Sequence, residues 1–134
     1  MFINHTVLIV DDEPDVLRLL DLELSHEGYT VLKASSGQEA VHKADLFIPD
    51  MIVMDILMPD MNGGQVLQEL KSNLKTRNIP VIFLTAVLSK EEEKSKHLRV
   101  AIEQEFYPAI AKPFDTKDLL YEINRRMPKV EKSV

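Results

Sequence analysis

Several polar residues of this sequence stand where short apolar runs end. Asp11 and Asp12 directly follow one such run, and Asp55 ends another. Thr85 and Lys112 end two later runs. If folding brings the three carboxylates within about 4 Å of one another, each pair repels by roughly 4 kcal/mol at an effective dielectric of about 20. Such a cluster either takes up protons or holds a cation.

The residue types restrict the cation and its chemistry. The chain has no cysteine and no clustered histidines, so the ligands would be oxygens. Oxygens suit Mg²⁺, with Mn²⁺ as the alternative ion, rather than zinc. Mg²⁺ commonly shares its ligands with a phosphate, which a lysine ammonium also binds. Aspartate, Mg²⁺, Lys112 and the Thr85 hydroxyl together suit phosphoryl transfer, with Asp55 as the best candidate acceptor.

Each of these residues also has an ordinary structural explanation. Asp11 or Asp12 could cap the helix that follows, and Asp55 could belong to a turn. Thr85 could be a plain strand residue, and Lys112 a solvated surface lysine. All these explanations would have to coincide at one place in the fold, so the position of the strands decides between them.

The chain alternates between short apolar runs, typical of buried strands, and segments with helical periodicity. The expected strands cover residues 6–10, 29–34, 50–55, 80–86 and 109–112. The expected helices cover residues 11–28, 36–47, 63–74, 89–104 and 115–127, the fourth of them highly charged and solvated. In the third helix the apolar side is expected to consist of Val66, Leu67, Leu70 and Leu74. This alternation predicts an α/β fold with a doubly wound, five-stranded parallel sheet, in which ligands bind at the carboxyl ends of the strands.

Composition indicates a single soluble domain. The chain has 134 residues, of which 45% are apolar and 28% charged. A net charge of −6 argues against nucleic-acid binding by this domain, since that role favours a basic face. The sequence shows no secretion signal and no apolar stretch long enough to span a membrane, so we expect a cytoplasmic protein with no membrane partner.

With these residues in this order, the chain resembles the receiver domain of two-component response regulators, the phospho-acceptor modules of histidine kinases. The resemblance rests on the motifs LIVDDEPD, MDILMPDMNG, FLTA and AKPF. It implies a flavodoxin-like (βα)5 fold with strand order 2-1-3-4-5. We expect the receiver domain to cover residues 1–128 and a polar C-terminal tail to cover 129–134.

The resemblance assigns the metal ligands and the acceptor by position. Asp55 is the phosphorylated residue. Asp11, Asp12 and Asp55 hold Mg²⁺ together with the backbone carbonyl of Leu57. Leu57 is apolar, and so is Val87, which lies two positions past the threonine. Apolar side chains there could obstruct the attacking water, so the sequence predicts slow loss of the phosphoryl group.

The resemblance also implies how the phosphoryl group is bound and read out. Thr85 and Lys112 contact the phosphoryl oxygens, helped by the backbone N–H groups of Leu57 and Ala86. In the family, an aromatic residue three positions before the lysine follows the movement of the strand-four hydroxyl. Ala109 stands at that position here, so the aromatic half of the relay is missing.

The implied partners are proteins. A histidine kinase or a phosphotransfer domain would supply the phosphoryl group, and a downstream protein would bind the face of the fourth helix, fifth strand and fifth helix. The sequence leaves open a homodimer and an output domain after Pro128. No substrate turnover is expected beyond self-phosphorylation from a phosphodonor and autodephosphorylation.

Two other functions compete with this interpretation. One is a pseudo-receiver, a protein-binding module of the same fold that is never phosphorylated. The missing aromatic favours it, and the complete acidic set argues against it. The other is a Mg²⁺-dependent phosphatase with an aspartyl intermediate. Such enzymes commonly carry a second aspartate two residues after the nucleophile, where Leu57 stands here.

Overall fold

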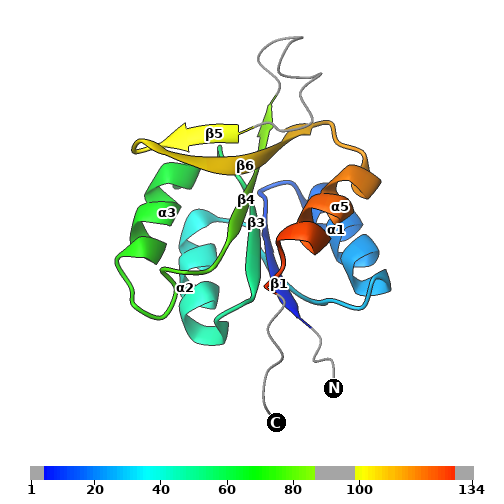
Figure 1. The fold of residues 1–134 in the computed structure, drawn as a ribbon, viewed down its shortest axis with the longest axis horizontal. Helices are drawn as coiled ribbons and strands as arrows, with labels where there is room; N and C mark the ends of the chain where they lie inside the picture. Colours follow the sequence, from blue (N-terminus) through cyan, green and yellow to red (C-terminus); the bar gives the residue numbers. More distant parts are fainter. Residues whose placement is uncertain (1–4, 87–98, 129–134) are drawn as a thin grey trace.

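Figure 1 shows the computed structural model of the chain, which describes residues 5–86 and 99–128 and has one sheet between two layers of helices. The strands are β1 (Thr6–Val10), β2 (Thr30–Ala34), β3 (Met51–Asp55), β4 (Val81–Ala86), β5 (Arg99–Ile102) and β6 (Glu105–Lys112). The described helices are α1 (Pro14–His26), α2 (Gly37–Phe47), α3 (Gly63–Lys71) and α5 (Thr116–Arg126). Helices α2 and α3 cover one face of the sheet, and α1 and α5 cover the other (Figure 1).

The strand order of the sheet is β2-β1-β3-β4-β6-β5. Strand β1 pairs in parallel with β2 and β3, β3 pairs with β4, and β4 pairs with β6. These pairings confirm the predicted doubly wound parallel sheet, with β6 in the place of the expected fifth strand. Because the paired strands are parallel, their carboxyl ends share one edge of the sheet. None of the described helices is long and apolar enough to cross a membrane.

A sixth strand, β5, corrects the prediction of a solvated helix at residues 89–104. Arg99–Ile102 pairs antiparallel with the first half of β6. Glu103 and Gln104 form the tight turn between the two strands, with φ angles of 51° and 71°. Positive φ at both central residues is typical of a type I′ turn, whose twist matches that of the two strands of a hairpin. Residues 89–98 of the predicted helix lie outside the described part of the chain.

Burial along β5 alternates as it does in a strand that covers a core. Val100 and Ile102 pack against the core, whereas Arg99 is exposed on the other face. The Arg99 guanidinium lies over the ring of Phe106, 5.2 Å from its centroid. An alternation with a period of two is the burial pattern of a strand, not of a helix. Because β5 pairs with the first half of β6, β6 begins at Glu105, whereas the sequence predicted a strand that begins at residue 109.

Side chains at the ends of the helices set their boundaries. At the start of α2, the Ser36 hydroxyl accepts the N–H of Glu39 at 3.1 Å. At the start of α3, Asn62 and Gln65 accept each other's backbone N–H groups at 2.9 Å, which is a capping box. Helix α3 ends at Lys71, so the prediction that Leu74 belongs to the apolar side of this helix is wrong, and Leu74 is 78% exposed.

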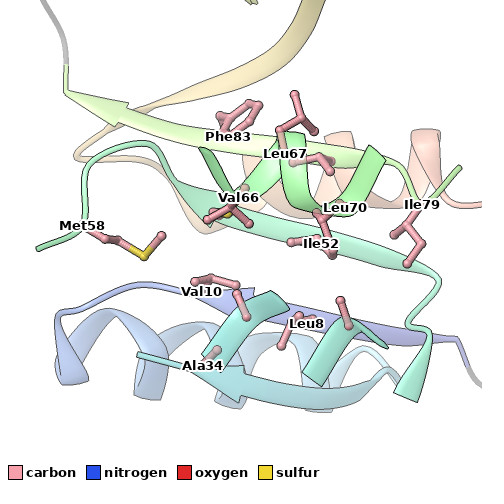
Figure 2. Packing of buried hydrophobic residues seen from close by; sticks show 14 of the residues in the cluster. Leu8, Val10, Ala34, Ile52, Met58, Val66, Leu67, Leu70, Ile79 and Phe83 are labelled. Atoms are coloured by element: carbon pink, nitrogen blue, oxygen red, sulfur yellow. The ribbon is translucent and has the colours of Figure 1, made fainter. Parts of the chain in front are cut away.

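The core consists of one apolar cluster on each face of the sheet. Leu8 and Val10 of β1 point into the cluster under α2 and α3, whereas Val7 and Ile9 point into the cluster under α1 and α5. Figure 2 shows the first cluster, into which residues of α3 insert from one side and strand residues from the other. Buried side chains on both faces explain why the strands read as continuous apolar runs.

Phe83 of β4 is a large, fully buried side chain of the first cluster. Its ring meets that of Tyr107 on β6 edge to face, with centroids 5.8 Å apart. On its other side it reaches the start of α3, where a Cβ on Gly63 would lie 2.7 Å from Phe83 Cε1. Phe83, itself on the central strand β4, therefore contacts both the hairpin of β5 and β6 and the start of α3.

Candidate functional site

A lysine and three aspartates meet at the carboxyl edge of the sheet. Nζ of Lys112 lies 2.7 Å from Oδ2 of Asp11 and 3.0 Å from Oδ2 of Asp55. Asp11, Asp12 and Asp55 each offer a carboxylate oxygen, and these atoms lie within 4.8 Å of one another. Asp11 is fully buried, Asp55 is nearly so, and Asp12 is exposed. The structure therefore brings together the carboxylates and the ammonium that the sequence singled out.

Strand β4 separates the strands that end in Asp55 and Lys112. In the sheet register, Asp55 lies opposite Leu84 and Lys112 lies opposite Ala86. Thr85 stands between these two β4 positions and hence at the same edge. Its hydroxyl donates to the carbonyl of Ala86 over 3.4 Å, which is long for a hydrogen bond of a hydroxyl. A rotation of this side chain would cost little and would redirect the hydroxyl.

The titration of Asp55 and Lys112 reflects their mutual contact and their burial. Burial raises the pKa of the Asp55 carboxyl, although hydrogen bonds from Lys112 and from the Leu57 N–H favour its charged form. Burial opposes the charge of Lys112, but hydrogen bonds to Asp11 and Asp55 outweigh it and raise the pKa of the ammonium. Lys112 is therefore positively charged at neutral pH, and an added cation would stabilise the Asp55 carboxylate.

Neither aspartate of the acidic pair caps α1. The N-cap residue is Glu13, which makes no side-chain capping bond. Oδ1 of Asp11 instead accepts the N–H of Glu13 at 2.9 Å. A carboxylate oxygen of Glu13 also lies 3.9 Å from Nζ of Lys112. The sequence reasoning missed this further acid around the ammonium, although its position directly after the acidic pair is a signal for it.

The donor set fits a hard divalent cation. Carboxylate oxygens of Asp11, Asp12 and Asp55 are the ligand type that Mg²⁺ prefers in proteins. The backbone of Leu57 adjoins them, because its N–H donates to Oδ1 of Asp55 at 3.2 Å. A bound cation and the Lys112 ammonium would place two positive charges around one carboxylate. Such an arrangement can stabilise an anionic group during its transfer.

Comparison with protein families shows to which family the chain belongs. Residues 7–124 match the model of the response regulator receiver domain. The chain belongs to this family. The predicted resemblance is therefore confirmed, and no comparison favours the pseudo-receiver alternative.

Several curated relatives of this receiver domain are response regulators. It is 36% identical over 124 residues to the alkaline phosphatase synthesis transcriptional regulatory protein PhoP of Bacillus subtilis. This match covers 92% of this chain and 47% of PhoP. It is 33% identical over 126 residues to the response regulator SaeR of Staphylococcus aureus. This match covers 94% of this chain and 52% of SaeR. The chain thus spans about half the length of the curated relatives that it matches.

Solved structures share the fold over nearly the whole receiver domain. The chemotaxis protein CheY4 of Vibrio cholerae superposes with a TM-score of 0.77 at 27% identity, covering 92% of this chain and 98% of CheY4. The response regulator TrrA of Thermotoga maritima, solved in complex with Mg²⁺ and BeF, superposes with a TM-score of 0.70 at 29% identity. That match covers 90% of this chain and 97% of TrrA.

Ala109, which stands three positions before Lys112, is buried in the core of this receiver domain. It lies opposite Phe83 in the pairing of β4 with β6. Tyr107, two positions earlier on β6 and hence on the same face of the strand, packs against the Phe83 ring. Two aromatic rings that the sequence did not relate to each other, those of Phe83 and Tyr107, thus meet at the strand positions around Ala109.

Proposed function

We propose that this receiver domain accepts a phosphoryl group on Asp55 in a Mg²⁺-dependent reaction. A carboxylate oxygen of Asp55 attacks the phosphorus, the bond from phosphorus to the donor breaks, and the donor leaves with that electron pair. The main support is the contact of the Lys112 ammonium with Asp55 and Asp11, beside the exposed Asp12. Catalysis of this kind consists mostly of positioning and charge neutralisation.

The residues that fit the metal are those of the acidic cluster. Asp11, Asp12 and Asp55 would hold Mg²⁺ through carboxylate oxygens, and Leu57 would add its backbone carbonyl. The bound ion would neutralise charge on the phosphoryl oxygens. Mn²⁺ accepts the same oxygen ligands and is the alternative ion. The TrrA complex with Mg²⁺ and BeF supports this assignment by similarity.

The remaining groups at this edge would bind the phosphoryl oxygens. The Lys112 ammonium would contact one oxygen, and the Thr85 hydroxyl would turn from the carbonyl of Ala86 towards another. The N–H groups of Leu57 and Ala86 would donate further hydrogen bonds. This set places fixed donors where negative charge develops.

The proposed partners follow from the reaction. A histidine kinase or a phosphotransfer domain would be the phosphodonor, which the domain would meet in the cytoplasm. A downstream protein, or a second copy in a homodimer, would bind the face of β6, α5 and the predicted fourth helix. Of the residues predicted for that helix, 89–98 lie outside the described part of the chain. Phe106 on β6 and Tyr121 on α5 are exposed aromatic side chains available to such a partner. We propose residues 1–128 as the domain and 129–134 as its tail.

Labelling with a small phosphodonor tests the acceptor. With acetyl phosphate and Mg²⁺, the wild-type protein is expected to gain the mass of one acid-labile phosphoryl group. Asp55→Asn is expected to gain none, because a carboxamide does not form the acyl phosphate. Intact-protein mass spectrometry with and without EDTA measures both results.

The matched control is Asp45→Asn, which removes an aspartate that pairs with Lys75 outside the site. This control is expected to label like the wild type. Phosphoryl uptake by Asp55→Asn at the wild-type level would assign the acceptor to another residue. No uptake by the wild-type protein would leave the pseudo-receiver function in its place.

The lifetime of the phosphoryl group is expected to depend on Leu57. This side chain is 70% exposed, and the backbone N–H of the same residue donates to Oδ1 of Asp55, which places residue 57 beside the acceptor. Leu57→Asn is expected to speed autodephosphorylation by about threefold or more, because a polar group there can orient the attacking water. Decay after removal of the phosphodonor measures the rate. The control Leu22→Asn, on an α1 residue that is 68% exposed, should leave it unchanged.

A further inference from the structure

Asp60, in the loop between β3 and α3, contacts the start of α2. Its Oδ1 accepts the N–H of Gly37 at 2.9 Å, and its Oδ2 accepts the N–H of Gln38 at 3.0 Å. These are the first N–H groups of α2, which no carbonyl of the helix can reach. Ser36 already accepts the next one, from Glu39. Asp60 therefore completes the start of a helix from a distant part of the chain.

This contact, which we call the Asp60 tether, joins Asp60 to Gly37 and Gln38 through a charged group. Hydrogen bonds from the N–H groups of Gln38 and Gly37 lower the pKa of the Asp60 carboxyl. The positive end of the α2 dipole acts in the same direction. The tether is therefore a two-point, charge-assisted contact, which is stronger and better defined in direction than a single neutral hydrogen bond.

Packing next to the tether holds the same two segments together. A Cβ on Gly37 would lie 2.7 Å from Cβ of Met61 and 3.0 Å from Cγ2 of Val66. Met61 packs against the core and directly follows Asp60 in the loop. Two neighbouring loop residues thus contact the first turn of α2, and the absence of a side chain at Gly37 permits this approach.

The same loop carries the backbone of Leu57 beside the acceptor carboxylate. The Leu57 side chain is 70% exposed and therefore does little to hold the loop. Before it, the N–H of Ile56 donates to the carbonyl of Leu84 at 3.0 Å, and after it Met58 is buried in the core. Beyond Met58, two contacts fix the path of the loop: the Asp60 tether to α2, and the hydrogen bond from the N–H of Gly63 to the carbonyl of Ile56 at 2.6 Å.

We propose that Asp60 is a positioning residue for phosphoryl transfer, which keeps the Leu57 backbone at the site by tethering its loop to α2. The inference rests on the proposed function, in which the Leu57 carbonyl binds Mg²⁺ and its N–H binds a phosphoryl oxygen. Asp60 itself acts only through the loop. Loss of groups that orient metal ligands typically weakens metal binding or activity by about 10- to 100-fold. A 1 Å displacement of a positioned group can cost about 10²-fold in rate.

The test compares Asp60→Ala and Asp60→Asn with the wild-type protein. Asp60→Ala is expected to weaken Mg²⁺ binding roughly tenfold, and to slow labelling by acetyl phosphate at saturating Mg²⁺ by about tenfold. Asp60→Asn should have a Mg²⁺ affinity and a labelling rate between those of Asp60→Ala and the wild type, because its amide oxygen can still accept one of the two N–H groups. The control Asp118→Asn removes an exposed acid from the first turn of α5 and should match the wild type in both measurements.

Two further results separate positioning from mere helix capping. If Asp60→Ala lowers only the melting temperature, and the folded variant keeps wild-type Mg²⁺ affinity and labelling rate, the inference is overturned and the proposed function stands. Gly37→Ala reaches the same contact from the helix side, since its Cβ displaces Met61, and should weaken Mg²⁺ binding in the same direction. A wild-type protein that takes up no phosphoryl group would overturn the proposed function and this inference with it.

Discussion

Lys112→Met is expected to slow phosphoryl labelling of this receiver domain by about 10²- to 10³-fold. The substitution keeps an unbranched side chain of similar length but removes the ammonium that lies 2.7 Å from Asp11 and 3.0 Å from Asp55. Without it, the incoming phosphoryl group meets carboxylates whose charge only the metal ion can balance. The rate of mass gain with acetyl phosphate at saturating Mg²⁺ measures the loss.

Lys117→Met is the matched control, because Lys117 is an exposed lysine in the first turn of α5. It should label at the wild-type rate. Lys112→Met should also unfold more readily in urea without Mg²⁺, since the fully buried Asp11 then lacks its cationic partner. Mg²⁺ should restore part of that stability. Wild-type labelling by Lys112→Met would show that the ammonium is a structural partner of the acids and has no role in the transfer.

Phe83→Ala is expected to lower the free energy of unfolding by roughly 3–5 kcal/mol. The ring is fully buried and contacts Tyr107 on one side and the start of α3, at Gly63, on the other. Its removal leaves a cavity between rigid strands and α3 that cannot fully close. For a domain of this size the melting temperature should fall by about 10 °C or more. Urea unfolding and thermal melting followed by circular dichroism measure both quantities.

The control for this prediction is Phe106→Ala, which removes the same side chain from a site on β6 that is 66% exposed. It should cost less than about 1 kcal/mol, most of it from the lost contact with the Arg99 guanidinium. Equal losses for the two variants would mean that Phe83 does not pack between the hairpin of β5 and β6 and helix α3.

The turn of this hairpin shows why the sequence alone did not predict it. Two-residue hairpins are usually signalled by glycine or asparagine at the positions with positive φ. Here Glu103 and Gln104 occupy those positions, and the strand before them is only four residues long. Because the charged residues upstream dominated the local pattern, only the pairing with β6 and the burial of Val100 and Ile102 could identify the strand.

The architecture and the composition of the site followed from the sequence by itself. Continuous apolar runs required strands buried on both faces, and their alternation with helices required a parallel sheet. In such a sheet the carboxyl ends of the strands coincide, so Asp11, Asp55 and Lys112 had to meet wherever their runs ended. Local pattern was sufficient here, because each site residue is attached directly to the end of a strand.

Other features of the site could be decided only by the tertiary structure. These are the burial of Asp11 beside an exposed Asp12, the approach of Glu13 to Lys112, and the Asp60 tether to α2. Each depends on the distance between segments far apart in the chain, or on how neighbouring elements shield one side chain from water. Neither quantity has a local signature in the sequence, because both are set by how the whole chain packs.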